Sequence, residues 1–399
     1  MTETIREPAR ETPVIGRYDV AVLGGGVAGL AAAVAAARRG ARTLLIEHHC
    51  VLGGLATEGL VAIYLPICDG RGRQVMAGLA EEMLRLSARH APTDIPECWS
   101  PGGSVEARHQ KRYLSHFAPH AYMIALEDFA LENGVKIFYD TRLVEAVCRG
   151  DALEAVIVES RSGREAVRAR VFIDATGDAE LCHRAGQATV VHRDNARAAW
   201  FYADEGTRVR LVQHHAPFTN PAPGEPLFGG DSRDEVTDML LKSRPMIMQR
   251  VRRLRQETNN PNLYPVLIGT IPQLRFTRCL AGAFELDASH VHQWIDDAVT
   301  LAPDWRAPGP VYAVPYRCLV ADRRSNLLVA GRCISSTRSG GEITRAIPVC
   351  VGTGEAAGTA AAIASQADAD LRTLDVPALQ QQLRRQGQLL DPTLVTPAE

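Results

Sequence analysis

The sequence predicts an α/β fold in which a parallel sheet is built from discontinuous segments of the chain, with an α+β domain inserted between them. Three segments predict this fold. A strand, a glycine turn, a helix and a second strand follow one another between residues 18 and 47. An apolar strand ends in an ATGD turn at 171–178, and another precedes an Ala/Gly-rich helix between 327 and 364. Parallel strands present their carboxyl ends at one edge of a sheet, so we expect the three segments to share one ligand site.

The first segment has the pattern of a Rossmann-type dinucleotide site. Asp19–Leu23 and Arg42–Ile46 are the expected strands, and three glycines between them form G-x-G-x-x-G: Gly24, Gly26 and Gly29. The first glycine allows a tight turn, the second lets the backbone approach a pyrophosphate, and the third lets the helix pack on the strand. Glu47 follows the second strand, where a carboxylate can accept the hydroxyls of an adenosine ribose. The alternative is a glycine-rich turn that holds no ligand.

The middle of the chain predicts one helix and several short strands. The helix is expected at Tyr122–Glu132, and the strands are expected at Val135–Tyr139, Leu143–Val147, Ala155–Glu159 and Glu165–Ala169. We expect these strands to form a small antiparallel layer. The next strand, Val171–Ala175, leads into the turn formed by Thr176, Gly177 and Asp178. Near the C-terminus, the Ala/Gly-rich helix is expected from about Val351 to Ala364, with Pro348 just before it.

Composition argues against several functional classes. The 399 residues include 44 basic and 46 acidic side chains, for a net charge of −2, and no basic run indicates nucleic acid or a membrane surface as a partner. Nine cysteines without a C-x-x-C favour reduced thiols and a cytoplasmic location. Val20–Ala37 carries no charge, but its glycine turn would interrupt a membrane-spanning helix.

Together these motifs resemble the two-dinucleotide-binding-domain flavoproteins. Within that group the chain is similar to the FAD-dependent oxidoreductases that carry LGG-x-A-T after the ribose acid and NLL-x-AGR-x-I-S near the C-terminus. Here those motifs are LGGLAT, beginning at Leu52, and NLLVAGRCIS, beginning at Asn326. The resemblance spans about Tyr18 to Ala364 and implies FAD as cofactor. No second G-x-G-x-x-G is visible, so a reductant other than the substrate would bind transiently or be a partner protein.

The resemblance also implies a role for each matching residue. Gly24, Gly26, Val27, Ala28 and Gly29 would line the pyrophosphate, Glu47 would hold the ribose, and Gly53, Gly54 and Thr57 would pass the ribityl or phosphate region. Val144 would meet the adenine, and Thr176, Gly177 and Asp178 would flank the adenosine. Gly331 and Arg332 would touch the ribityl chain, although many relatives carry an acid in place of Arg332, and Gly352, Thr353 and Gly354 would present N–H groups to the flavin N1/C2 edge.

The implied domain boundaries follow from the same segments. Residues 14–182 and 313–370 would form the FAD-binding domain, and residues 183–312 the inserted substrate domain, to which residues 68–116 could contribute. Residues 371–399 would form a C-terminal tail.

Candidates for catalysis are weaker and each has an alternative role. Arg317 and Arg345 could clamp a substrate carboxylate or polarise a carbonyl, with Glu342 as a partner of Arg345, or they could be interdomain ion pairs. Tyr64 and Cys68 follow the LGGLAT loop and could approach the flavin, with an incidental buried thiol as the alternative for Cys68. Arg275 and Arg278 belong to the same arginine pattern.

Histidines give no stronger signal. His214 and His215 could supply a base but are more typical of a solvated loop, and His290 and His292 are expected to be structural. No carboxylate stands at ligand spacing from these pairs, so we expect no metal.

The function implied is an FAD-dependent oxidoreductase that transfers hydride between a small organic substrate and flavin N5. Oxygen or a redox partner would complete the electron transfer. Two alternatives remain open. One is a non-redox flavoenzyme such as a hydratase or isomerase, and the other is a nucleotide-binding structural or sensing module.

Overall fold

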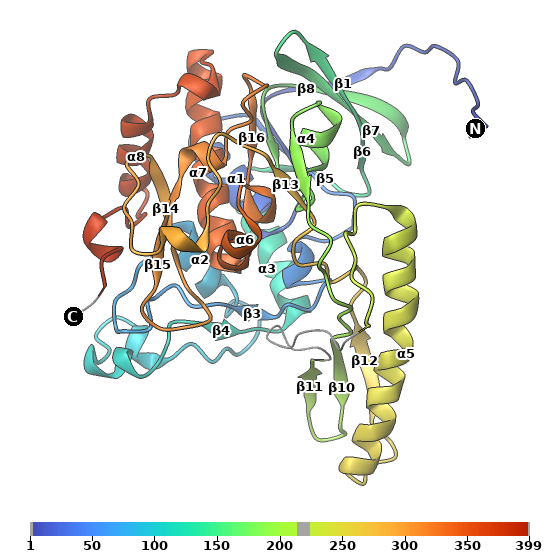
Figure 1. The fold of residues 1–399 in the computed structure, drawn as a ribbon, viewed down its shortest axis with the longest axis vertical. Helices are drawn as coiled ribbons and strands as arrows, with labels where there is room; N and C mark the ends of the chain where they lie inside the picture. Colours follow the sequence, from blue (N-terminus) through green and yellow to red (C-terminus); the bar gives the residue numbers. More distant parts are fainter. Residues whose placement is uncertain (1–2, 214–223, 398–399) are drawn as a thin grey trace.

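A seven-stranded sheet forms the centre of the molecule, seen in the computed structural model of residues 3–213 and 224–397 (Figure 1). Its path runs through β5 (Lys136–Phe138), β2 (Thr43–Ile46), β1 (Val14–Leu23), β8 (Gly163–Asp174), β7 (Ala152–Ser160) and β6 (Arg142–Arg149), with β16 (Leu327–Val329) added on β8. β5, β2, β1, β8 and β16 are parallel, whereas β7 and β6 are antiparallel. This arrangement confirms the predicted α/β fold with a sheet built from distant segments.

The expected antiparallel layer is part of this same sheet, because Leu143–Val147, Ala155–Glu159 and Glu165–Ala169 lie in the adjoining antiparallel strands β6, β7 and β8. Val135–Tyr139 does not belong to that layer: it corresponds to β5, which pairs parallel with β2 at the opposite edge. Glu165–Ala169 and Val171–Ala175 were expected as two strands, but they belong to one strand, β8, of 12 residues. β7 pairs with the first half of β8, and β16 pairs with its last three residues. The intervening Arg170 points to solvent while Val167 and Val171 are buried, so the charged residue does not end the strand.

Two apolar helices pack against each other beside the sheet. α1 (Val27–Arg38) and α7 (Ile347–Ala367) meet through alanine and glycine, and α7 also contacts β8, β14 (Ala298–Pro303), α2 (Leu79–Leu86) and α8 (Val376–Arg385). By length and composition α7 could cross a membrane, but 94% of its most apolar window is buried inside the protein, as is typical of a core helix. It begins four residues before the expected Val351, because Pro348 lies within its first turn.

A smaller lobe protrudes from this core, at the lower right of Figure 1. It consists of β10 (Phe201–Asp204), β11 (Val209–Val212), β12 (Tyr264–Ile268) and the long helix α5 (Arg233–Glu257). Its hydrophobic core is its own and includes Phe201, Val251 and Leu254. The separate core therefore covers a narrower range than the predicted substrate domain at 183–312.

The remaining elements join the main core. β14 pairs with β15 (Val311–Pro315), β9 (Thr189–Val191) with β13 (Arg278–Leu280), and β3 (Ile63–Tyr64) with β4 (Ser115–His116). The other helices are α3 (Pro119–Glu132), α4 (Glu180–Arg184) and α6 (Arg338–Thr344). Residues 371–399, expected as a tail, instead contribute α8, whose Leu379 and Leu383 are buried in the main core.

Candidate functional site

The glycine turn after β1 has the geometry that its sequence predicts. Gly24 has φ +102°, and a Cβ there would lie 2.5 Å from the carbonyl oxygen of Ala175. A Cβ on Gly29 would lie 1.8 Å from the carbonyl oxygen of Gly24, so only glycine lets α1 start this close to the strand. A Cβ on Gly26 would meet nothing within 4 Å. The turn is therefore closed toward the protein and open on the side of Gly26.

The N-terminus of α1 faces this open side without a cap. Gly26 is the N-cap residue, no side chain caps the helix, and no acidic residue occupies the first turn. The N–H groups of Val27, Ala28 and Gly29 therefore have no intrahelical partner, and they carry the positive end of the helix dipole. These features fit the pyrophosphate of a dinucleotide.

Glu47 lies at the edge of the same turn. Its buried carboxylate accepts hydrogen bonds from the N–H of Gly25 (2.6 Å) and of His49 (2.8 Å), and it lies 2.9 Å from Nδ1 of His48. Burial acts to raise the pKa of Glu47, but these partners hold it below its ordinary value. The ionised carboxylate suits a ribose diol. Glu47, His48 and His49 also place three possible metal-ligand atoms within 4.8 Å, but the carboxylate is already engaged by these three donors.

The LGGLAT loop lies against the glycine turn. Gly53 has φ +106°, and its N–H donates to the carbonyl of Gly25 at 2.9 Å. Thr57 supports the loop from behind, because its buried hydroxyl donates to the carbonyl of Leu52 at 2.8 Å. Gly54 approaches Gly26, with 3.4 Å between a Cβ built on Gly54 and the Cα of Gly26. The two glycine segments thus form one continuous surface.

The ATGD turn closes the other side. Thr176 donates to the buried Asp174 and accepts hydrogen bonds from Asp178 N and Glu180 N, so it holds the turn in place. Gly177 has φ +81°, and a Cβ there would meet the guanidinium of Arg332. Asp178 accepts a hydrogen bond from Thr277, in a loop that leads from the small lobe.

Val144 and Arg332 have partners inside the protein. Val144 lies where the β6–β7 register shifts, and its carbonyl accepts a hydrogen bond from Arg184. Arg332 donates to the carbonyl of Leu274 at 2.9 Å and lies 3.9 Å from Asp178. Gly331, with φ +79°, donates its N–H to Thr353 at 3.0 Å. Arg332 therefore links the ATGD turn to the loop at 274–275.

The expected contact of Gly352, Thr353 and Gly354 with the flavin edge requires a correction. Because α7 starts at Ile347, these residues lie in its second turn and their N–H groups belong to the helix ladder. Gly354 instead lets α7 approach α1, since a Cβ there would lie 2.2 Å from the carbonyl of Ala28. The free N–H groups of α7 are those of Ile347 and Val349 in its first turn, next to Arg345.

Arg345 and Glu342 form an ion pair within α6 and its C-cap. Arg345 Nε donates to Glu342 at 2.9 Å, and Arg338 binds the same carboxylate and also Asp194. Burial opposes ionisation of Glu342, but the two arginines hold its pKa below the ordinary value. The Arg345 guanidinium lies 5.2 Å from the centre of the Trp305 ring. The pair is local rather than interdomain, and its catalytic role remains a prediction.

Arg275 differs from these arginines because it lacks an acidic partner. Its guanidinium stacks 4.7 Å from the centre of the Trp200 ring, and among the described residues no carboxylate lies within ion-pair distance. Burial, together with the charges of Arg345 and Arg332, lowers its pKa to about 9 against the opposing effect of Glu342. The sequence offered a signal, since no acidic residue stands within four positions of Arg275.

His192 is a neighbour of this cluster that sequence reasoning missed. Its ring lies 4.3 Å from Phe276, and its Nε2 lies 3.6 Å from Sγ of Cys279. Burial lowers its pKa, so the imidazole is neutral near pH 7. No motif marks His192, because β9 and β13 bring it to the cluster from a distant part of the chain.

Three of the expected catalytic residues lie elsewhere. Arg317 follows β15 on the surface, where Asp297 binds its half-exposed guanidinium at 3.0 Å, so it does not join Arg345. Tyr64 is fully buried and donates to the carbonyl of Ala80 at 2.6 Å, and burial raises its pKa well above the ordinary value. Cys68 is buried and accepts from Tyr113 N, and burial raises its pKa, which disfavours a redox thiolate.

The expected histidines contribute little to the site. His290 caps a short turn with Asp287, and Nδ1 of His292 lies 2.7 Å from the carbonyl of Val395. His214 and His215 lie outside the described residues.

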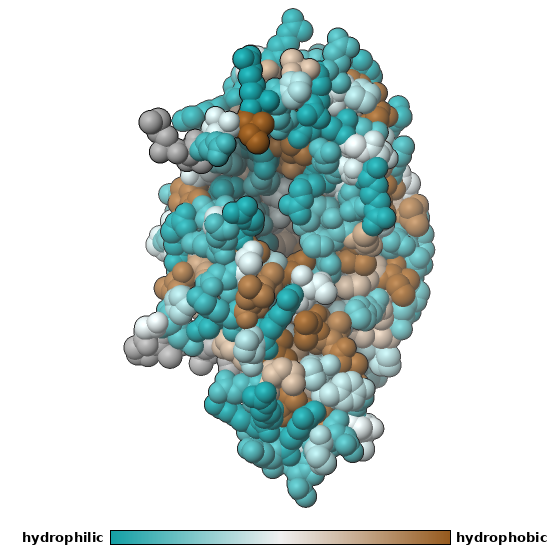
Figure 2. Space-filling view, turned by 90° about the vertical axis from the view of Figure 1, so that its right-hand side faces the viewer, coloured by the Kyte–Doolittle hydropathy of each residue, from teal (hydrophilic) through white to brown (hydrophobic). Residues whose placement is uncertain are grey.

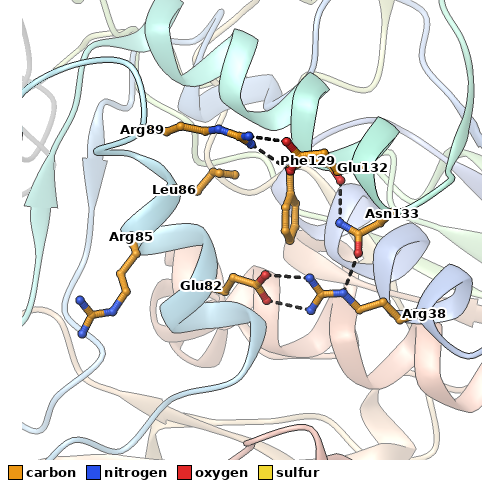
Figure 3. A pocket seen from close by; sticks show the side chains of 8 residues that line it. All are labelled: Arg38, Glu82, Arg85, Leu86, Arg89, Phe129, Glu132 and Asn133. Atoms are coloured by element: carbon orange, nitrogen blue, oxygen red, sulfur yellow. Dashed lines mark hydrogen bonds and ion pairs between the residues drawn. The ribbon is translucent and has the colours of Figure 1, made fainter. Parts of the chain in front are cut away.

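Surface hollows occur at several places. A pocket of about 490 Å³ lies at the C-terminal end of α1, far along the helix from the glycine turn, and its charged side chains pair with one another, as Arg38 does with Glu82 (Figure 3). A second pocket includes Arg317 and Arg372. Figure 2 shows a further hollow, rimmed by hydrophilic residues, between the upper part of the molecule and the lobe below.

The family of FAD dependent oxidoreductases matches residues 19–265 and 233–383 of this chain, and so covers most of it. Among solved structures, the p-nitrophenol 4-monooxygenase PnpA of Pseudomonas putida DLL-E4 shares the fold, with a TM-score of 0.51 at 13% identity over 93% of this chain and 85% of that one.

Curated relatives match part of the chain. The digeranylgeranylglycerophospholipid reductase of Methanoculleus marisnigri is 27% identical over 186 residues, or 44% of this chain and 42% of that protein. The aklavinone 12-hydroxylase DnrF of Streptomyces peucetius subsp. caesius is 28% identical over 203 residues, which are 44% of this chain and 40% of that protein. The matches thus span about two fifths of these relatives' length. With the uncapped glycine turn, the ribose acid and the family match in agreement, this chain belongs to the FAD dependent oxidoreductases, and its cofactor is FAD.

Proposed function

We propose that this enzyme transfers a hydride between a C–H bond of a small organic substrate and N5 of FAD. The observation that carries the proposal is the cluster at the start of α7, where charged and aromatic side chains gather beside a helix N-terminus. Arg345, Glu342 and Arg338 approach it from α6, and Arg275 approaches from the loop that follows the small lobe. Bound FAD supplies the two-electron chemistry.

The residues of this cluster would orient the substrate. The rings of Trp305 and Phe276 lie under Arg345 and Arg338, with 5.2 and 5.6 Å from guanidinium carbon to ring centre. Trp305 is only partly buried, and such a ring can exclude water and bind the flat apolar part of an organic molecule, whereas Phe276 is fully buried and supports Arg338 from beneath. The first-turn N–H groups of α7 add positive potential, which favours a negative charge that develops nearby during reduction.

Proton movement would fall to His192. Its imidazole is neutral near pH 7 because burial lowers its pKa, and it lies against Phe276 within the cluster. A neutral imidazole accepts a proton from a substrate hydroxyl or amine when hydride leaves the adjacent carbon. A cytoplasmic location, and oxygen or a protein as electron acceptor, belong to the same proposal.

An anaerobic screen of small organic compounds against the FAD-loaded protein tests this function. We expect at least one compound to bleach the flavin absorbance while being oxidised in equal amount. Deuterium at the reacting carbon should slow the bleaching. If instead a compound is converted while the flavin stays oxidised throughout, the enzyme is a non-redox flavoenzyme and the proposal fails.

A further inference from the structure

The arginine cluster at the start of α7 has more positive than negative charge. Four arginines meet three carboxylates: Arg275, Arg332, Arg338 and Arg345 against Asp178, Asp194 and Glu342. Arg338 and Arg345 share Glu342, and Arg332 lies 3.9 Å from Asp178. The unmatched charge is that of Arg275, whose side chain donates no hydrogen bond within the described ranges. An enclosed cation without a partner is costly unless a ligand completes it.

The loop that carries Arg275 is held firmly at both ends. Gln273 donates to the carbonyl of Gly59, just beyond the LGGLAT loop, at 2.6 Å. At the other end Thr277 donates to Asp178 in the ATGD turn. Between them, Oδ1 of the buried Asn195 accepts from Arg275 N at 2.9 Å. The backbone of Arg275 is therefore fixed between two loops of the cofactor site.

The side chain of Arg275 is also oriented. Its guanidinium carbon lies over the Trp200 ring, 4.7 Å from the ring centre, and its N–H groups donate no hydrogen bond within the described ranges, so they are left for another partner. Arg275 remains partly accessible to solvent although the surrounding protein lowers its pKa to about 9, a combination typical of a residue in a cleft. A guanidinium edge matches a carboxylate or phosphate through two parallel hydrogen bonds.

We propose that Arg275 is the receptor for an anionic group, and that this group belongs to the substrate. The enzyme would thus act on small organic anions, in which a carboxylate or similar group binds Arg275 while an apolar or aromatic body lies near the partly buried Trp305. The inference rests on the proposed function for its last step only, because binding of an anion to Arg275 requires no turnover. The pyrophosphate of FAD is the other anionic group that could bind Arg275.

Anion binding to the oxidised, FAD-loaded protein tests the assignment. The probes are formate, acetate, benzoate and inorganic phosphate, with benzamide as a neutral counterpart of benzoate. Binding is followed by the change in flavin absorbance and by calorimetry. We expect saturable binding of at least one anion and none of benzamide. If none of the four anions binds, the proposal is overturned.

Two variants of Arg275 and one control assign the effect. Arg275→Met should weaken binding of the responsive anion about 10-fold to 150-fold, the loss expected for charged hydrogen bonds. Arg275→Lys keeps the positive charge but lacks the two parallel N–H donors of the guanidinium. Its anion affinity should therefore lie between those of Arg275→Met and the parent protein. Arg317→Met removes an arginine from the distant surface pocket and should leave binding unchanged. Equal anion affinity in Arg275→Met and the parent protein contradicts the proposal.

The affinity for FAD separates the two sources of the anion. We expect Arg275→Met to bind FAD within twofold of the parent protein, with an equal or higher melting temperature, because the variant removes a partly buried charge that has no acidic partner among the described residues. A tenfold loss of FAD affinity would assign Arg275 to the pyrophosphate and overturn the substrate assignment. Failure of the hydride proposal is detected separately, since anion binding is measured without reduction of the flavin.

Discussion

Among single residues, Glu47 gives the sharpest test of the nucleotide site. Glu47→Ala removes the acceptor for the ribose and the bonds from Gly25 and His49. Loss of a charged hydrogen bond costs about 1.5–3 kcal/mol, or on the order of 10-fold to 150-fold in FAD affinity. Titration of apoprotein with FAD, followed by fluorescence quenching, measures this change. Glu82→Ala, in α2 where Glu82 pairs with Arg38 at the C-terminal end of α1, is the control and should bind FAD normally. Unchanged affinity in Glu47→Ala would remove Glu47 from the site.

The sequence predicted the roles of residues whose contacts lie within a short segment, and it failed for residues whose partners come from distant segments. The roles of Gly24 and Gly29 follow from a turn of a few residues, and the structure shows the close contacts that require glycine. Arg317 and Arg345 looked equivalent in sequence, but Asp297 holds Arg317 on the surface from a different segment. His192 reaches the cluster only through β9–β13 pairing, which single-sequence patterns do not specify.

Among the elements, the contact between α1 and α7 gives a second prediction. A Cβ on Gly358 would lie 2.0 Å from the carbonyl of Ala32. Gly358→Ala should therefore destabilise the protein by about 1–3 kcal/mol through overpacking, although alanine favours a helix by up to about 1 kcal/mol. Thermal unfolding measures the loss. Ala367→Ser, in the exposed last turn of α7, is the matched control. A Gly358→Ala protein as stable as the parent would contradict the close helix contact.

A buried carboxyl in α7 gives a third prediction, on pH. Burial raises the pKa of Glu355 to about 7 from 4.5, and Oε2 accepts from Leu79 N and from Gln388. The folded state holds the proton more tightly than the unfolded chain. The stability from Glu355 is therefore fully present below pH 4.5 and is lost as the pH rises toward 7. The loss is on the order of 3 kcal/mol, at about 1.36 kcal/mol per pKa unit.

Glu355→Gln measures this contribution directly. The amide oxygen can accept both hydrogen bonds without ionising, so the variant should unfold several degrees above the parent at pH 8 and close to it below pH 5. The exposed Glu97→Gln is the control and should follow the parent at both pH values. Parallel pH profiles for Glu355→Gln and the parent would show that Glu355 is not buried in its neutral form.

Prediction of the elements succeeded where the pattern was local. β1, α1 and β2 follow from the glycine turn and the apolar runs around it. Both strands end at the expected residue, although β1 begins at Val14 rather than Asp19. α7 begins earlier than predicted because Pro348 lies inside its first turn, where proline is also favoured, rather than before the helix. The attachment of α8 depends on the contact of Leu379 and Leu383 with the main core, which no local pattern specifies.

On the scale of the whole molecule, the small lobe gives a fourth prediction. Phe201 and Ile268 are register partners on β10 and β12, so the lobe enters and leaves the main core at neighbouring points. Replacing residues 201–268 by Gly-Gly should leave a folded, yellow protein that binds FAD, because the lobe has its own core. Reduction by substrate should be lost, since Leu274, next to Arg275, loses its packing against Phe228 and Met239.

Absorbance spectra and flavin content check that the shortened protein folds and binds FAD, and anaerobic reduction checks the loss of activity. A colourless, insoluble product would show that the lobe is part of the folding unit of the FAD domain.

The close packing of α7 on α1 also bears on how the protein matures in the cell. The two helices meet backbone to backbone through Gly354 and Gly358, and the chain alone supplies every atom of that contact. We therefore expect this part of the core to form before the flavin binds. Cells starved of riboflavin should accumulate folded apoprotein, protected from proteolysis and ready to load, rather than degraded chains. Biogenesis would then separate into folding of the chain and a later insertion of FAD, and flavin supply would set the active fraction without setting the amount of protein.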